Sequence, residues 1–188
     1  MAMATEESSK SQESKWEGKL CAELEGISAE HVWPLLADFF NLHNWMPGID
    51  TCQPLEGVSG QPGCIRYCAK TTTSPPASSS ESPAKEEITA TTMWANERLV
   101  AIDPVERSLS YVVTENNMGI KSYMATMKVL QFSKVAAAAN SEGCQIEWTF
   151  VADPVEGWTF EGLLSFFESC LQGMAQKMED VLCPSTKA

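Results

Sequence analysis

Residues 158–183 read WTFEGLLSFFESCLQGMAQKMEDVLC, and this stretch decides the fold. Apolar residues recur along it at steps of three and four, which is typical of one face of an amphipathic α-helix. This apolar stripe consists of Phe160, Leu163, Leu164, Phe167, Leu171, Met174, Met178 and Val181. Thr159 can cap the helix, Glu161 suits its first turn, and Pro184 gives a stop. We therefore expect one long C-terminal helix that buries this stripe against the rest of the chain.

The chain before this helix is dominated by alternating apolar and polar residues, the pattern of half-buried β-strands. We predict strands at 16–24, 49–55, 64–72, 88–94, 98–102, 109–114, 122–132 and 144–152, where 88–102 could be one long bent strand. Two short helices, 28–37 with Ser28 as N-cap and 38–45, follow the first strand. Neighbouring strands joined by turns make an antiparallel sheet, and the helices are segregated from it. The predicted class is therefore α+β, with about seven strands curved around the long helix.

The length of 188 residues fits one domain, which we place at 15–183. Residues 1–14 and 184–188 are expected to be tails. The segment 71–85 is rich in Ser, Thr and Pro and is expected to be a flexible loop. A soft, alanine-containing connection is expected at 133–143.

Composition argues against several partners. The net charge of −12 is unsuited to nucleic acid and to anionic membranes. No apolar run reaches the roughly 20 residues of a membrane helix, and the polar N-terminus does not resemble a signal peptide. The seven cysteines include no Cys-x-x-Cys pair, so we expect no metal site. Free thiols then indicate a reduced, cytoplasmic location.

Polar residues sit singly among apolar neighbours on several predicted strands. Alternation places Arg66 on one face with Cys64 and Cys68, and Tyr123 on one face with apolar residues. Such surroundings are typical of a concave ligand site, which is mostly apolar with few convergent polar groups. Arg66 and Glu97 would have to pair there, because an isolated buried charge is costly. That pair could serve chemistry or could be a structural ion pair.

The motifs WEGK (16–19), WPLLADF (33–39), LHNWMP (42–47), GCIRY (63–67), WANERLVAID (94–103), YMATM (123–127) and EWTF (147–150) occur in this order. With them the chain resembles plant lachrymatory-factor synthases of the START-like, birch-pollen-allergen-like superfamily, from about Trp16 to Val181. The resemblance implies a helix-grip fold with a cavity between sheet and long helix, and no cofactor. It implies catalytic roles for Arg66, Glu97 and Tyr123. The expected cavity lining is Cys68, Met93, Leu99, Tyr111, Met127, Trp148, Phe160, Leu164, Phe167 and Leu171.

Two functions follow from this comparison. The first is a cofactor-independent isomerase that converts a sulfenic acid to a thial S-oxide, with Arg66 orienting an oxygen, Glu97 moving a proton and Tyr123 donating a hydrogen bond. The alternative is a non-catalytic carrier or sensor of a lipid, terpenoid, phenolic or hormone-like ligand. Both need a small hydrophobic molecule as the partner.

Overall fold

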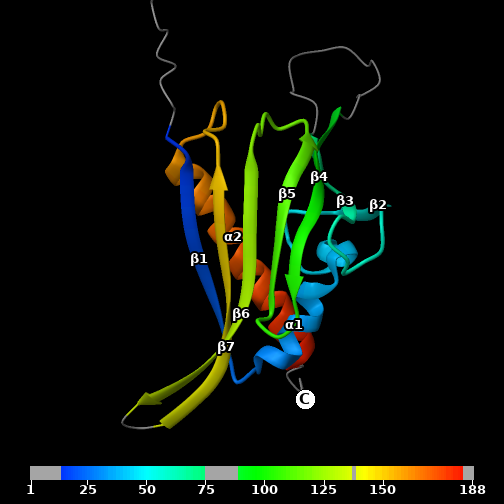
Figure 1. The fold of residues 1–188 in the computed structure, drawn as a ribbon. Coiled ribbons are helices and arrows are strands. Elements are labelled where there is room, and N and C mark those ends of the chain that lie inside the picture. The colour runs from blue at the N-terminus through cyan, green and yellow to red at the C-terminus, as the bar shows by residue number, and fades with distance from the viewer. Residues whose placement is uncertain (1–13, 75–88, 137–138, 184–188) are drawn as a thin grey trace, which may run out of the picture.

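The computed structural model describes residues 14–74, 89–136 and 139–183. Seven strands and three helices follow one another in the predicted order (Figure 1). The strands are β1 (Trp16–Glu25), β2 (Thr51–Glu56), β3 (Ile65–Ser74), β4 (Thr89–Asp103), β5 (Ser108–Asn116), β6 (Tyr123–Ala136) and β7 (Ala139–Ala152). The helices are α1 (Ala29–Ala37), the 3-10 helix η1 (Phe39–Asn44) and α2 (Phe160–Leu182).

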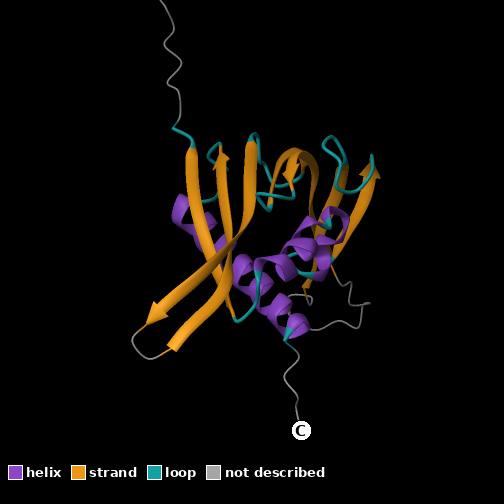
Figure 2. Ribbon diagram, turned by 60° about the horizontal axis from the view of Figure 1, so that its bottom comes forward, coloured by secondary structure: helices purple, strands orange, loops and turns teal. Residues whose placement is uncertain are grey.

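All seven strands form one antiparallel sheet in the order β1-β7-β6-β5-β4-β3-β2. Strands β2 to β7 each pair with their neighbours in sequence, whereas β1 pairs with the last strand. The segment with α1 and η1 therefore carries the chain from one edge of the sheet to the other. The sheet curves around α2, which crosses its concave face (Figures 1 and 2). The predicted α+β helix-grip fold is confirmed.

The long helix begins and ends close to where the sequence predicts. The Thr159 side chain caps it by accepting a hydrogen bond of 3.1 Å from the Gly162 backbone N–H. Leu171, Met174 and Met178 of its stripe are fully buried in the core, together with residues such as Leu24 and Ile146 from the sheet. Val181 is 59% exposed, so the stripe ends one turn earlier than predicted. The core thus lies between α2 and the sheet.

Several boundaries differ from the prediction. The connection expected at 133–143 is largely strand, since β6 and β7 stay in register to the pair Ala136–Ala139. The end of this hairpin extends beyond the body of the sheet (Figure 1). Residues 71–74 of the expected loop belong to β3, and 75–85 lie outside the described residues, as do 1–13 and 184–188. Alanine and serine have a low intrinsic preference for β-strands. These segments are nevertheless strand, because hydrogen bonds to the partner strand outweigh that preference.

The two strands predicted within 88–102 are one strand, β4 (Thr89–Asp103), with two irregularities. Its register with β5 shifts between Asn96 and Glu97 and again between Leu99 and Ala101. Bulges of this kind bend a strand and redirect its side chains. The first shift lies beside Glu97, which shares the concave face with Met93 and Ala95.

At the first short helix, Ser28 occupies the N-cap position but makes no capping hydrogen bond. Its hydroxyl instead pairs with Nδ1 of His31 at 2.9 Å. The second short helix is a 3-10 helix with an irregular residue at Asn41.

Candidate functional site

A cavity of about 180 Å³ lies between the concave face of the sheet and α2. Its walls come from β3 to β7, from the segment around η1, and from the α2 face that looks toward the strands. Of the residues predicted for the site, seven line it: Cys68, Met93, Glu97, Tyr111, Tyr123, Trp148 and Phe167. Five strands and the long helix thus bring these side chains together.

The other predicted residues lie elsewhere. Leu99, Met127 and Leu171 are at most 2% exposed and belong to the packed core rather than to the cavity wall. Phe160 packs on Trp16 of β1, with ring centroids 6.0 Å apart, and Leu164 is part-buried against the core. Alternation alone cannot separate these groups, because it identifies residues that face inward but not whether they meet packed atoms or open space.

The face of α2 that borders the cavity is rotated from the predicted one. It presents Leu163, Phe166, Phe167 and Cys170, which also repeat at steps of three and four. The same repeat can be read in the sequence, although Phe166 and Cys170 lie outside the predicted stripe. The other lining residues that sequence reasoning missed are Leu42, Met46, Gly48, Ile49, Ala69, Lys70, Trp94, Ala95, Val113, Met118, Ile120, Ala152, Val155 and Trp158.

The mouth of the cavity is apolar. Met93, Trp158 and Phe166 line the cavity and are each between 43% and 46% exposed. Trp158 and Phe166 pack edge to face with ring centroids 5.7 Å apart. The one cation of the wall within the described residues, Lys70, is already paired with Asp50 at 2.8 Å. An apolar molecule therefore meets apolar side chains from the mouth inward.

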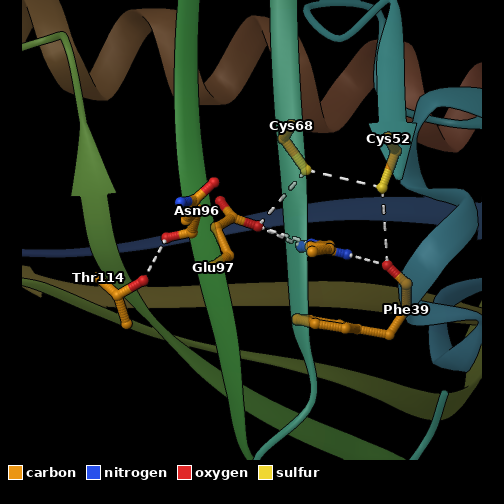
Figure 3. Close-up of polar contacts among 7 residues, drawn as sticks. Phe39, Cys52, Cys68, Asn96, Glu97 and Thr114 are labelled. Carbon is orange, nitrogen blue, oxygen red and sulfur yellow. Dashed lines mark hydrogen bonds and ion pairs between the residues drawn. The ribbon is translucent and has the colours of Figure 1, made fainter. Parts of the chain in front are cut away.

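Arg66 and Glu97 form the ion pair that the sequence required. They are opposite each other in the β3–β4 register, and the Glu97 Oε2 atom accepts from Arg66 Nε at 2.7 Å and lies 2.6 Å from Nη2. Arg66 also donates from Nη1 to the Phe39 backbone carbonyl at 2.7 Å, and its guanidinium lies 3.9 Å from the centre of the Phe39 ring (Figure 3). Burial is the largest single effect and opposes the charged form, but the Glu97 carboxylate together with Cys68, Tyr111 and Cys52 outweighs it, so the pKa of Arg66 is raised.

Arg66 and Glu97 differ in their access to the cavity. Arg66 is 3% exposed, is held on three sides, and is not among the residues of the wall. Glu97 lines the wall, and its contacts within the described residues all involve Oε2: two from Arg66 and a weak one of 3.9 Å from the Cys68 thiol. The second carboxylate oxygen is therefore the charged atom that a ligand can meet.

Two polar atoms of the wall have no hydrogen-bond partner. Among the described residues, the Tyr123 hydroxyl and the Trp148 indole Nε1 are buried and unsatisfied. Burying such a group unpaired costs about 1–3 kcal/mol, so each one marks a place where a partner is missing. Tyr111 and Trp148 are both close enough to Tyr123 to influence its pKa, yet no hydrogen bond of good geometry joins the Tyr123 hydroxyl to either of them.

Aromatic packing holds these two donors in place. The Phe167 ring of α2 stacks on Trp148 with centroids 4.7 Å apart and meets Tyr123 edge to face at 5.9 Å. Phe150 stacks on Tyr123 from the sheet side at 6.0 Å. Burial raises the pKa of Tyr111 and of Tyr123, so both phenols remain protonated donors at neutral pH.

A helix-grip fold around an apolar cavity with a few fixed polar groups defines a class of proteins that hold small molecules. Residues 23–182 match the family described as "Polyketide cyclase / dehydrase and lipid transport". The chain belongs to this family, and hydrophobic ligand binding is the function that the family implies.

Solved structures of similar fold come from bacteria and plants. XoxI of Bacillus cereus is 21% identical, with 88% of this chain and 94% of that chain covered and a TM-score of 0.58. Major latex-like protein 151 of Panax ginseng is 18% identical, with 90% and 99% covered and a TM-score of 0.57. An uncharacterised protein of Bacillus thuringiensis is 19% identical, with 87% and 99% covered and a TM-score of 0.57. At these identities the likeness shows the fold.

No helix in the described part of the chain combines the length and hydrophobicity needed to cross a membrane. The same residues contain no group of three His, Cys, Asp or Glu side chains arranged to hold a metal ion.

Proposed function

We propose that this protein binds a small, mostly apolar molecule that carries one hydrogen-bond acceptor, and that it acts as a carrier or sensor of that molecule. The observation that carries the proposal is the pair of unsatisfied donors, the Tyr123 hydroxyl and Trp148 Nε1, in a mainly apolar wall. The indole N–H is a donor only, so the ligand group that meets it must be an acceptor such as a carbonyl, ether, sulfoxide or hydroxyl oxygen.

The rest of the cavity supports an apolar body for this ligand. Its wall and mouth are lined mainly by aliphatic, aromatic and sulfur-containing side chains. The Glu97 carboxylate and the net charge of −12 disfavour an anionic ligand. The carrier role also agrees with the lipid-transport part of the family description.

Two adjacent residues of β5 allow a matched test of binding. Val113 lines the cavity, whereas Val112 is next to it on the opposite face of the sheet. The full-length chain is incubated with acetylnaphthalene, an aromatic ketone, and examined by native mass spectrometry. We expect one bound molecule in the wild type and in Val112→Phe, and none in Val113→Phe, where the added ring fills the cavity. An empty wild-type protein, or equal uptake by both folded variants, would contradict the proposal.

A second candidate is the isomerase, and the position of Glu97 favours it. Glu97 lines the cavity and Arg66 holds its Oε2 atom, so the carboxylate is fixed and its Oε1 atom remains for proton transfer. With an alkenyl sulfenic acid, Glu97 would take the hydroxyl proton and return it to the far vinylic carbon. The O–H bond breaks and a C–H bond forms, while C=C becomes a single bond and C–S becomes C=S. The product, a thial S-oxide, is an isomer, so no cofactor is consumed.

In this mechanism Arg66 is a positioning residue, because it lies behind Glu97 and outside the wall. The substrate oxygen would instead be held by Tyr123 and Trp148. The test supplies an alkenyl sulfenic acid generated in place and follows the thial S-oxide by gas chromatography. Product that disappears with Glu97→Gln, while that variant still binds acetylnaphthalene, supports the enzyme. Binding in both proteins without any Glu97-dependent product leaves the carrier as the function.

All seven cysteines are free, which supports the further proposal that the protein works in the reduced cytoplasm.

A further inference from the structure

Two buried thiols face each other beside the cavity, and neither proposed function uses them. Cys52 of β2 and Cys68 of β3 are directly opposed in the strand register, with Sγ atoms 3.7 Å apart. Both side chains point toward each other (Figure 3), and both residues are less than 8% exposed. Of the other five cysteines, Cys21 and Cys183 are exposed, and Cys64, Cys144 and Cys170 are buried as free thiols.

The backbone geometry suits a bond between the two sulfur atoms. Directly opposed residues of an antiparallel pair have Cα atoms about 4.5–5.5 Å apart. A disulfide spans about 4.4–6.8 Å between Cα atoms and needs sulfur atoms about 2.05 Å apart. Rotation about the two side-chain torsions can bring the sulfurs closer without a new register. β2 is an edge strand, so it is bound to the sheet on one side and can adjust.

The surroundings favour a thiolate at Cys52. The hydrogen bond from the Cys68 thiol lowers the pKa of Cys52, burial opposes this, and the Arg66 charge and His43 add to the lowering. The same hydrogen bond raises the pKa of Cys68, as do burial and the Glu97 carboxylate. The pair therefore shares one proton unequally, with Cys52 as nucleophile and Cys68 as the protonated partner.

The cavity supplies a path to this pair. Cys68 lines the cavity wall, and Cys52 lies directly behind it. A small oxidant that enters the cavity meets the Cys68 sulfur at the wall, and the Cys52 sulfur lies 3.7 Å beyond it.

We propose that Cys52 and Cys68 are a redox modification site, which a hydroperoxide oxidises to a disulfide between β2 and β3 and which a thiol reductant restores. In the first step the Cys52 thiolate attacks the outer peroxide oxygen, the O–O bond breaks, and the leaving oxygen takes up a proton. Cys52 is then a sulfenic acid. In the second step the Cys68 sulfur attacks the Cys52 sulfur, the S–O bond breaks, and water leaves with the Cys68 proton. The two thiols lose two electrons together and the peroxide gains them.

The bridge changes the wall of the cavity. In the reduced protein the Cys68 sulfur contacts the Glu97 Oε2 atom at 3.9 Å. Formation of the disulfide would move this sulfur toward Cys52 and away from Glu97. The chemistry does not depend on the natural ligand, so it can be tested without one.

The sequence provides a convenient test by peptide mapping. Trypsin cuts after Lys19, Arg66 and Lys70, so Cys68 falls in the peptide 67–70, and Cys52 falls in the peptide 20–66 with Cys21 and Cys64. The folded full-length protein is treated with hydrogen peroxide, blocked with N-ethylmaleimide, and digested without reduction. We expect the peptides 20–66 and 67–70 to be joined, with fragmentation placing the bond at Cys52, and dithiothreitol to separate them.

Matched variants sharpen the result. Cys64→Ser, which removes the thiol two residues from Arg66, should keep the bridge, and Cys52→Ser should lose it. If Cys52→Ser does not fold, fragmentation of the wild-type peptide pair still decides between Cys21, Cys52 and Cys64. A peptide 67–70 that stays unlinked while the exposed Cys21 or Cys183 becomes oxidised would overturn the proposal. A link from Cys68 to Cys21 or Cys64 would overturn it as well.

Discussion

Glu97 lies between the buried guanidinium of Arg66 and the cavity, and Arg66 holds one of its two carboxylate oxygens. The Arg66 Nη2 atom is 2.6 Å from Glu97 Oε2, behind the cavity wall, and the carboxylate itself is part of that wall. A charged residue in an apolar cavity is stable only with such a partner. The pair therefore explains how the cavity keeps one ionised group without losing the fold.

The first prediction concerns the stability that depends on this pair. Arg66→Met leaves the Glu97 carboxylate buried and unpaired, and Glu97→Leu leaves the Arg66 guanidinium with the Phe39 carbonyl alone. Each single change should lower the free energy of unfolding by about 3–5 kcal/mol. The double variant should be more stable than either single variant, because no charge remains unpaired. Urea unfolding of the four proteins measures this, and additive losses would argue against the coupling.

A second prediction concerns the packing of α2 on the loop after η1. A Cβ atom on Gly173 would lie 2.5 Å from Pro47 Cγ, which is too close for a rigid ring. Gly173→Ala should cost about 1–3 kcal/mol through overpacking, against a helix-propensity gain of about 1 kcal/mol. Gly162→Ala is the control, since its Cβ meets nothing closer than Thr159 Oγ1 at 3.1 Å. Thermal unfolding should rank Gly173→Ala below Gly162→Ala, and the reverse order would show that this contact relaxes easily.

A third prediction concerns alkaline pH. Burial raises the pKa of Tyr111 and Tyr123 in the folded protein, while both ionise near pH 10 when unfolded. Below pH 10 both states are neutral and this contribution to stability is complete. Above pH 10 the unfolded state loses protons first, so the free energy of unfolding falls by up to about 1.4 kcal/mol per pH unit for each tyrosine.

Above pH 10, the free energy of unfolding of Tyr123→Phe should therefore fall less steeply with pH than that of the wild type, by up to about 1.4 kcal/mol per pH unit. Tyr67→Phe is the matched control, because Tyr67 stacks on Trp94 and does not line the cavity. Urea unfolding at a series of alkaline pH values supplies both slopes. Equal slopes for wild type and Tyr123→Phe would contradict the assignment of Tyr123 as a deeply buried phenol.

The sequence predicts the large features of the fold because they rest on periodicity. The 23-residue α2 helix, the N-cap at Thr159 and the alternation of β1 are all local patterns, and the structure confirms them. The pairing of Arg66 with Glu97 also follows from sequence, since two buried opposite charges leave few alternatives. Family membership from residue 23 to residue 182 agrees with this reading.

Other features depend on how helices and strands pack against each other, and local sequence patterns do not determine this packing. Two stripes at steps of three and four run along α2, and tertiary packing decides which one borders the cavity. The Cys52–Cys68 contact depends on the β2–β3 register, which shifts at Pro54 and Glu56. The strand character near Ala136 and Ala139 comes from pairing in a long hairpin, against the propensity of alanine.

In the proposed complex, the Tyr123 hydroxyl and the Trp148 indole N–H donate hydrogen bonds to an acceptor on an apolar ligand. The most direct measurement compares the dissociation constants of acetylnaphthalene and of isopropenylnaphthalene, a hydrocarbon of closely similar shape in which a CH2 group replaces the carbonyl oxygen, by isothermal titration calorimetry. The wild type should bind the ketone about thirtyfold more tightly, because two hydrogen bonds of about 1 kcal/mol each together contribute about 2 kcal/mol. The Tyr123→Phe/Trp148→Phe double variant should bind both with equal affinity. A wild type that does not distinguish the two molecules, or a double variant that still prefers the ketone, would contradict the claim.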